Sequence, residues 1–137
     1  MLRKSGIGFA VLVALALTVS IVAAGNAHFV GTPSLTTSGN TLSASGKVAG
    51  LGNIDQITVT VSGEAACINP GSKKPQAANK QTVSADGDFP VQNGKANFQV
   101  SATATFQPDC TPPMTVQWSN LSIVVTDPAG TVLATYP

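Results

Sequence analysis

The single histidine, His28, carries the sharpest chemical hypothesis in the sequence. If the chain is cleaved after Ala27, His28 presents a free α-amine and an imidazole on one residue, and copper favours such nitrogen ligands. Comparable copper sites add at least one further imidazole, and the sequence has no second histidine. The sequence therefore predicts no metal centre and no cofactor, and it leaves His28 as a candidate copper ligand.

The two cysteines, Cys67 and Cys110, are the next candidates for chemistry. Their spacing is not the Cys-x-x-Cys of redox proteins, and neither has an obvious base beside it to activate a thiolate. Two cysteines in an exported chain more often form a structural disulfide. We therefore expect a Cys67–Cys110 bridge that staples the fold and has no redox role.

Catalytic machinery is difficult to assemble from the remaining residues. A nucleophile needs an adjacent base, and the chain has one histidine, one glutamate (Glu64) and one tyrosine (Tyr136). The closely spaced carboxylates of Asp86-Gly87-Asp88 could form an acid-base pair, but two aspartates flanking a glycine are also typical of a polar turn. We interpret this segment as a turn and predict that the protein is not an enzyme.

Residues 68–81 form the longest stretch without strand periodicity, and they contain two prolines and three lysines. Loops held by a rigid scaffold are common sites of recognition. One hypothesis makes this segment a recognition loop, in which Lys73, Lys74, Asn79 and Lys80 bind a protein or a cell-surface polymer. The other makes it a solvated connection, tied down by the disulfide.

The first 27 residues predict an export signal. Arg3 and Lys4 precede an apolar run over residues 7–24, and small residues ending in Ala27 follow it. The alternative is a retained membrane anchor, because the run approaches the length that crosses a bilayer. With cleavage, residues 28–137 form a single domain that is secreted or associated with the cell envelope and has no stable membrane insertion.

Charge excludes one class of partner. Loss of Arg3 and Lys4 from the 7 basic residues leaves only lysines, against 6 acidic residues. Nucleic-acid binding relies on clustered lysine and arginine that neutralise phosphates. We therefore expect no nucleic-acid partner.

Alternation of apolar and polar residues predicts β-strands with one buried face. The clearest runs alternate through residues 57–61 and 96–106, and weaker ones pass through 42–48, 83–85, 89–92 and 132–136. The run over 114–125 changes phase, which predicts a β-bulge near Ser119-Asn120. Within this run we interpret Trp118 as a core residue rather than a surface platform.

Turn signals separate these runs and complete the predicted fold. Asn93-Gly94 predicts a tight hairpin, and Asp127-Pro128-Ala129-Gly130 predicts a type I turn. About seven strands with short joints are typical of an immunoglobulin-like antiparallel β-sandwich. If successive strands alternate in direction, the strands before Cys67 and Cys110 finish at the same end, and the bridge joins two end loops there.

A resemblance covers nearly the whole mature chain. The run from His28-Phe29, the loop of Cys67-Ile68-Asn69-Pro70-Gly71 continuing to Ala78-Asn79-Lys80, and Cys110 before Pro112-Pro113 are similar to a group of small exported bacterial proteins of unknown function. The resemblance implies an exported, disulfide-linked domain. The function that we predict is a non-enzymatic binding or surface-associated structural module. The alternatives are a copper-binding protein that uses His28, and a subunit of an extracellular assembly that pairs through edge strands.

Overall fold

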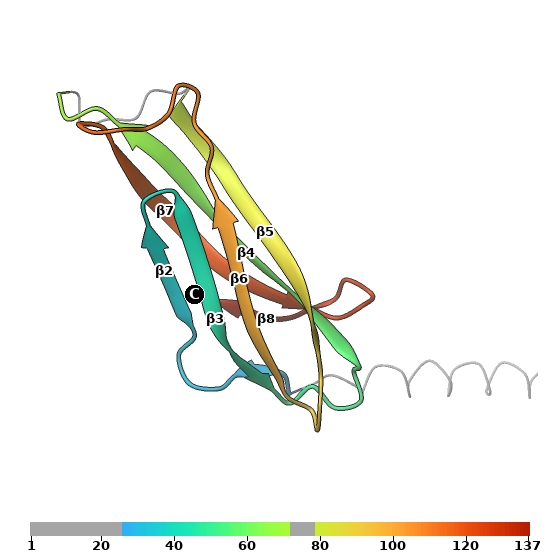
Figure 1. The fold of residues 1–137 in the computed structure, drawn as a ribbon. Helices are drawn as coiled ribbons and strands as arrows, with labels where there is room; N and C mark the ends of the chain where they lie inside the picture. The colour runs from blue at the N-terminus through green and yellow to red at the C-terminus, as the bar shows by residue number, and fades with distance from the viewer. Residues whose placement is uncertain (1–25, 72–78) are drawn as a thin grey trace, which may run out of the picture.

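The computed structural model describes residues 26–71 and 79–137, which form two antiparallel β-sheets packed face to face (Figure 1). The expected all-β sandwich is confirmed. The predicted export signal lies outside the described residues, apart from Asn26 and Ala27. The strands are β1 (His28–Phe29), β2 (Ser34–Ser38), β3 (Thr41–Ala49), β4 (Gln56–Ile68), β5 (Lys80–Pro90), β6 (Ala96–Thr103), β7 (Thr115–Thr126) and β8 (Val132–Tyr136).

The first sheet is built around β3. Strand β6 pairs with one side of β3, and β1 and β2 pair with successive parts of its other side. The second sheet has the order β5-β4-β7-β8. Every pairing is antiparallel. Strands β4 and β6 belong to different sheets and run in the same direction (Figure 1), as the alternation of strands predicts.

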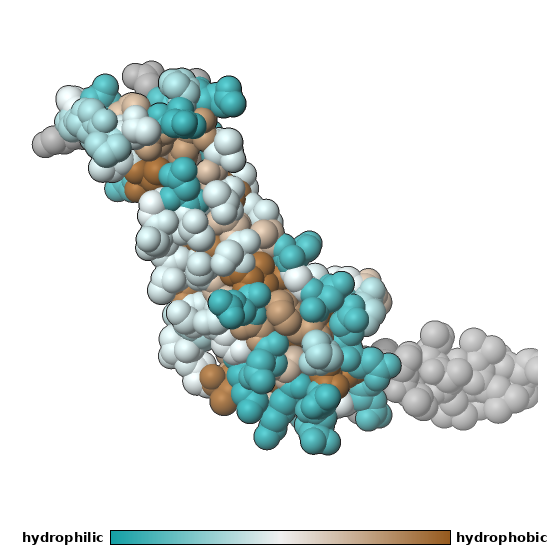
Figure 2. All heavy atoms as spheres, in the orientation of Figure 1, coloured by the Kyte–Doolittle hydropathy of each residue, from teal (hydrophilic) through white to brown (hydrophobic). Residues whose placement is uncertain are grey.

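The core lies between the sheets and follows the predicted alternation. Ile57, Val59 and Val61 of β4 are fully buried, while the threonines between them face outward. Strand β6 alternates buried and exposed residues along its whole length, and Ala104 and Phe106 continue the buried row beyond its end. Figure 2 shows the result on one face, where polar residues cover most of the surface and apolar residues emerge in patches between them.

Both predicted turns are present. Asn93 and Gly94 have φ values of 55° and 74°, the left-handed conformation that a two-residue hairpin turn needs. The amide of Gly130 donates to the carbonyl of Asp127 at 2.9 Å and closes the turn before β8. The Asn93-Gly94 turn also carries the chain from the second sheet to the first, because β5 pairs with β4 and β6 pairs with β3.

The predicted β-bulge lies in β7. The pairing of β4 with β7 passes from Ser62↔Ser122 to Glu64↔Ser119, so that β7 contains one extra residue. Asn120 adopts a positive φ of 54° there. The phase change returns both halves of β7 to the core, and Trp118 packs against the core while its indole N–H donates to the carbonyl of Gly39 at 2.9 Å.

The structure corrects the strand prediction around Asp86-Gly87-Asp88. Asp86-Gly87-Asp88 is not a turn but part of β5, which runs unbroken from Lys80 to Pro90 and joins two runs that we expected to be separate. The aspartates are tolerated because β5 is an edge strand whose outward positions face water. Gly87 leaves room for the Phe89 ring, which a Cβ at Gly87 would approach to 3.1 Å.

The disulfide lies at one end of the sandwich, which we call the bridged end. The Asn93-Gly94 turn lies at the opposite end, which we call the turn end. The β2–β3 hairpin stops short of the bridged end, so β4, β5 and β7 extend past it (Figure 1). Residues 104–114 cross this region after β6, and Phe106 is buried there. The irregular segment thus completes the core where the first sheet ends.

Candidate functional site

The predicted Cys67–Cys110 disulfide is formed, with an S–S distance of 2.05 Å and a Cα–Cα distance of 5.7 Å. Cys67 is the penultimate residue of β4 rather than a loop residue, and only 5% of it is exposed. Cys110 belongs to the segment that crosses the bridged end. The bridge therefore fixes this segment to the second sheet. Beside the bridge, Sγ of Cys67 lies 3.8 Å from Sδ of Met114.

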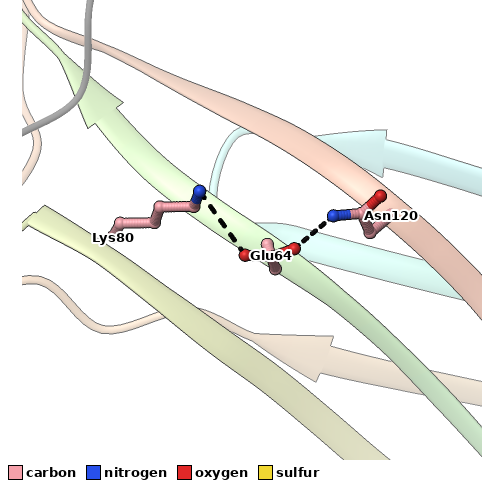
Figure 3. A network of polar contacts seen from close by, with 3 residues as sticks. All are labelled: Glu64, Lys80 and Asn120. Carbon is pink, nitrogen blue, oxygen red and sulfur yellow. Dashed lines mark hydrogen bonds and ion pairs between the residues drawn. The ribbon is translucent and has the colours of Figure 1, made fainter. Parts of the chain in front are cut away.

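A polar network spans three strands beside the bridged end (Figure 3). Glu64 of β4 accepts a hydrogen bond at Oε2 from the amide of Asn120 in β7, and its Oε1 lies 3.6 Å from Nζ of Lys80 in β5. The Asn120 hydrogen bond and then the charge of Lys80 lower the pKa of Glu64, against an opposing effect of desolvation. A general base works best with a pKa near the working pH. The lowered pKa moves Glu64 away from this range, and its contacts link β4 to β5 and β7.

The structure places the predicted recognition residues differently from the sequence expectation. Lys80 is not in a loop, because it begins β5 and pairs with Ala66 of β4. Asn79 precedes it and is half-buried. Lys73 and Lys74 lie outside the described residues. The predicted loop of residues 68–81 therefore shortens at both ends, since Ile68 belongs to β4 and Gln81 to β5.

The candidate copper ligand His28 lies at the turn end, in β1, where it pairs with Ala49. Its ring Nδ1 is 2.7 Å from the carbonyl oxygen of Asn26, and the side chain is exposed. Within residues 26–71 and 79–137, no group of three or more histidine, cysteine, aspartate or glutamate residues could hold a metal ion. Copper binding by His28 stays a hypothesis.

The aspartates of β5 also have defined places. The hydroxyl of Thr58 in β4 donates to Asp88 at 2.7 Å, across the outer face of the second sheet. Asp86 lies on the same face, opposite Thr60. These carboxylates belong to a row of outward polar residues that includes the hydrogen-bonded hydroxyls of Ser62 and Ser122, 2.9 Å apart.

Sequence reasoning missed a polar hollow of about 410 Å³ at the turn end. Its polar lining consists of Lys47, Gln92, Asn93, Lys95 and Asn97. The residues come from β3 and from the chain around the β5–β6 turn, which are distant in sequence. The sequence predicted the Asn93-Gly94 hairpin at this end, but a hairpin does not predict that Lys47 pairs with Asn97 in the first sheet.

Within residues 26–71 and 79–137, no helix is long and apolar enough to cross a membrane.

Comparisons with known proteins yield similarity to solved structures alone. No family model and no curated protein matches the chain. Two of the similar structures are a β-glucuronidase of Bacteroides uniformis and the β-glucuronidase 2 of B. uniformis covalently bound to cyclophellitol-6-carboxylate aziridine. Each is 16% identical to this chain, with a TM-score of 0.38 over 81% of it, and the chain spans 14% of the length of each.

Proposed function

We propose that the protein is an exported, non-enzymatic β-sandwich that acts as a binding or surface-associated structural module. The disulfide is the observation that carries this proposal. Disulfides persist in oxidising compartments and are rare in the cytosol, and this bridge secures the end of the sandwich from which the 69–79 connection emerges. A connection mounted on a cross-linked scaffold is suited to recognition.

The arrangement of strands supports an immunoglobulin-like class within the sandwich folds. Strands β2, β3 and β6 correspond in order to A, B and E of that fold, and β8-β7-β4-β5 to G-F-C-C′. Such domains bind through loops at their ends as well as through their sheets. The bridge from β4 to the segment after β6 differs from the inter-sheet B–F disulfide of antibody domains.

The test of this function examines both the export of the protein and its binding partner. Intact mass of the exported protein should correspond to a chain that begins at His28. Affinity capture from culture supernatant and cell envelope, with the full mature protein as bait, should retain a protein or a surface polymer. Recovery of the chain with residues 1–27 in the membrane fraction would contradict the proposed address.

The double variant K73S/K74S tests whether the connection is the binding element. It should lose the captured partner. Its melting temperature should stay unchanged if these lysines lie in a solvated loop, as the sequence predicts, because substitutions there usually alter stability by less than about 0.5 kcal/mol. Lys80 is left in place, since its ion pair with Glu64 makes it part of the scaffold. Capture of the same partner by the variant would make this segment a connection only.

Edge strands favour a second candidate, a subunit that pairs with neighbours. Strands β2 and β8 are edge strands of the two sheets, and neither contains a charged residue or a proline. Natural proteins commonly block exposed edges with such residues, and 56% of Val132 in β8 is exposed. Sedimentation should then show concentration-dependent assembly that V132K weakens. A monomer at all concentrations would exclude this candidate.

A further inference from the structure

The hollow at the turn end places two lysines on one face of the first sheet. Lys47 of β3 is the register partner of Asn97 in β6. Lys95 lies two residues before Asn97, and the residue between them, Ala96, is buried, so Lys95 and Asn97 face the same side. Both ammonium groups therefore belong to one surface, together with the amides of Gln92, Asn93 and Asn97.

The backbone around this hollow is held by several hydrogen bonds. Gln92 and Lys95 exchange two backbone hydrogen bonds of 2.8 and 3.1 Å across the Asn93-Gly94 turn. The carbonyl of Gly94 accepts a further bond from the amide of Leu51, which is fully buried. Because the turn is anchored to the core, the polar groups on it are positioned before any ligand arrives, which reduces the ordering cost of binding.

Within the part of the chain that the structure describes, no acidic side chain neutralises the lysines of this hollow. Among the described residues, the ion pair that forms joins Lys80 to Glu64, and neither Lys47 nor Lys95 has an acidic partner within ion-pair distance. Asp55 lines an adjoining hollow that shares Asn93, but it does not line this one. The local field therefore favours an anion.

The surface that continues from the hollow carries hydroxyl and amide groups. Gln99, Ser101 and Thr103 follow Asn97 on the exposed side of β6, and Ser43 of β3 lies within hydrogen-bond distance of Ser101. These groups can bond the hydroxyls of a sugar or polyol, whereas arginine and aromatic residues, which commonly bind nucleic acid bases, do not line the hollow.

We propose that this hollow, lined by Lys47 and Lys95, binds the acidic groups of a cell-surface polysaccharide or polyol polymer. The ammonium groups pair with a phosphate or carboxylate, and the carboxamides bond neighbouring hydroxyls. The proposal rests on the proposed export, because such polymers lie outside the cytoplasm. It places the polymer site at the opposite end of the sandwich from the 69–79 connection, so that the partner proposed for that connection is then a protein.

The test titrates the full mature protein with a poly(glycerol phosphate), with polygalacturonate, with neutral dextran and with double-stranded DNA. Binding to at least one of the two acidic polymers is expected, and whichever binds more tightly distinguishes phosphate from carboxylate. K47Q/K95Q should weaken that binding by about tenfold or more, because it removes both ammonium groups that pair with the anion, and tenfold corresponds to about 1.4 kcal/mol. K47R/K95R should retain most of it.

The charge-matched control is S84E/T135E, which lowers net charge equally on exposed positions of the second sheet. It should bind the polymer nearly as tightly as the parent, and both variants should keep the parent melting temperature. If K47Q/K95Q and S84E/T135E weaken binding equally, the loss of affinity is explained by net charge alone, and the proposal is overturned. Tighter binding to DNA, or no binding to either acidic polymer, would overturn it as well. The capture test with K73S/K74S stands apart, because it uses different residues and a different readout.

Discussion

Reduction of the Cys67–Cys110 bridge should lower stability by an amount that follows from the length of the loop it closes. The cysteines are 43 residues apart, and on the chain-entropy model a closed loop of this size contributes about 4 kcal/mol at 25 °C. For a domain of about 100 residues this corresponds to a fall in melting temperature of roughly 15–20 °C. The loss is a large part of the 5–15 kcal/mol that is typical of small domains.

The assay is thermal unfolding followed by circular dichroism, with and without a phosphine reductant, after thiol titration confirms that both cysteines are reduced. Reduction is preferable to substitution alone, because Cys67 is 95% buried and its replacement by alanine also removes packing. C67A/C110A serves as the control, since the reductant should leave its melting temperature unchanged. A fully reduced parent that melts within a few degrees of the oxidised protein would refute the loop-closure reasoning.

Three further outcomes are expected. E64Q should flatten the fall in stability at acid pH. Because the pKa of Glu64 is lowered in the folded protein, its stabilising contribution is present above the unfolded pKa of about 4.3 and is lost as the pH falls through the folded-state pKa. The melting temperatures of the parent and E64Q should therefore differ at pH 7 and converge in strong acid. N120A should be less stable than N120G in chemical unfolding, because both lose the amide but only glycine adopts the positive φ without strain. Mature protein should release copper readily to a competing chelator, because His28 offers one imidazole; tight retention that disappears in H28A would contradict this.

Periodicity made much of the fold predictable, and the failures occurred where burial was weak. The strands with a continuous buried row, such as β4 and β6, were evident because their side chains alternate strictly between core and water. Strand β2 was missed because Leu35 is its single apolar residue. Within β5, a glycine between two aspartates resembled a turn, and the covering Phe89 ring that explains the glycine depends on tertiary structure.

The candidate sites were less predictable than the fold. The disulfide could be predicted because the number of cysteines is read from the sequence and the direction of each strand follows from simple alternation along the chain. The Glu64 network and the lysine hollow depend on which strands become neighbours and in which register, and turn chemistry does not specify this. Lys47 and Lys95 line one hollow because β3 pairs with β6 in the first sheet.

The position of the disulfide also determines how the molecule responds to mechanical force. Tension applied to the two ends of the chain passes through the bridge, so the 43-residue separation between the cysteines keeps roughly 140–155 Å of contour length from extending. Strands β5 and β6 lie inside this shielded loop, whereas β3 lies outside it. Stretching that peels β3 from β6 would therefore carry Lys47 away from Lys95 while the loop stays closed. If the proposed polymer binds this hollow, it would be released under load and bound again when the sheet re-forms.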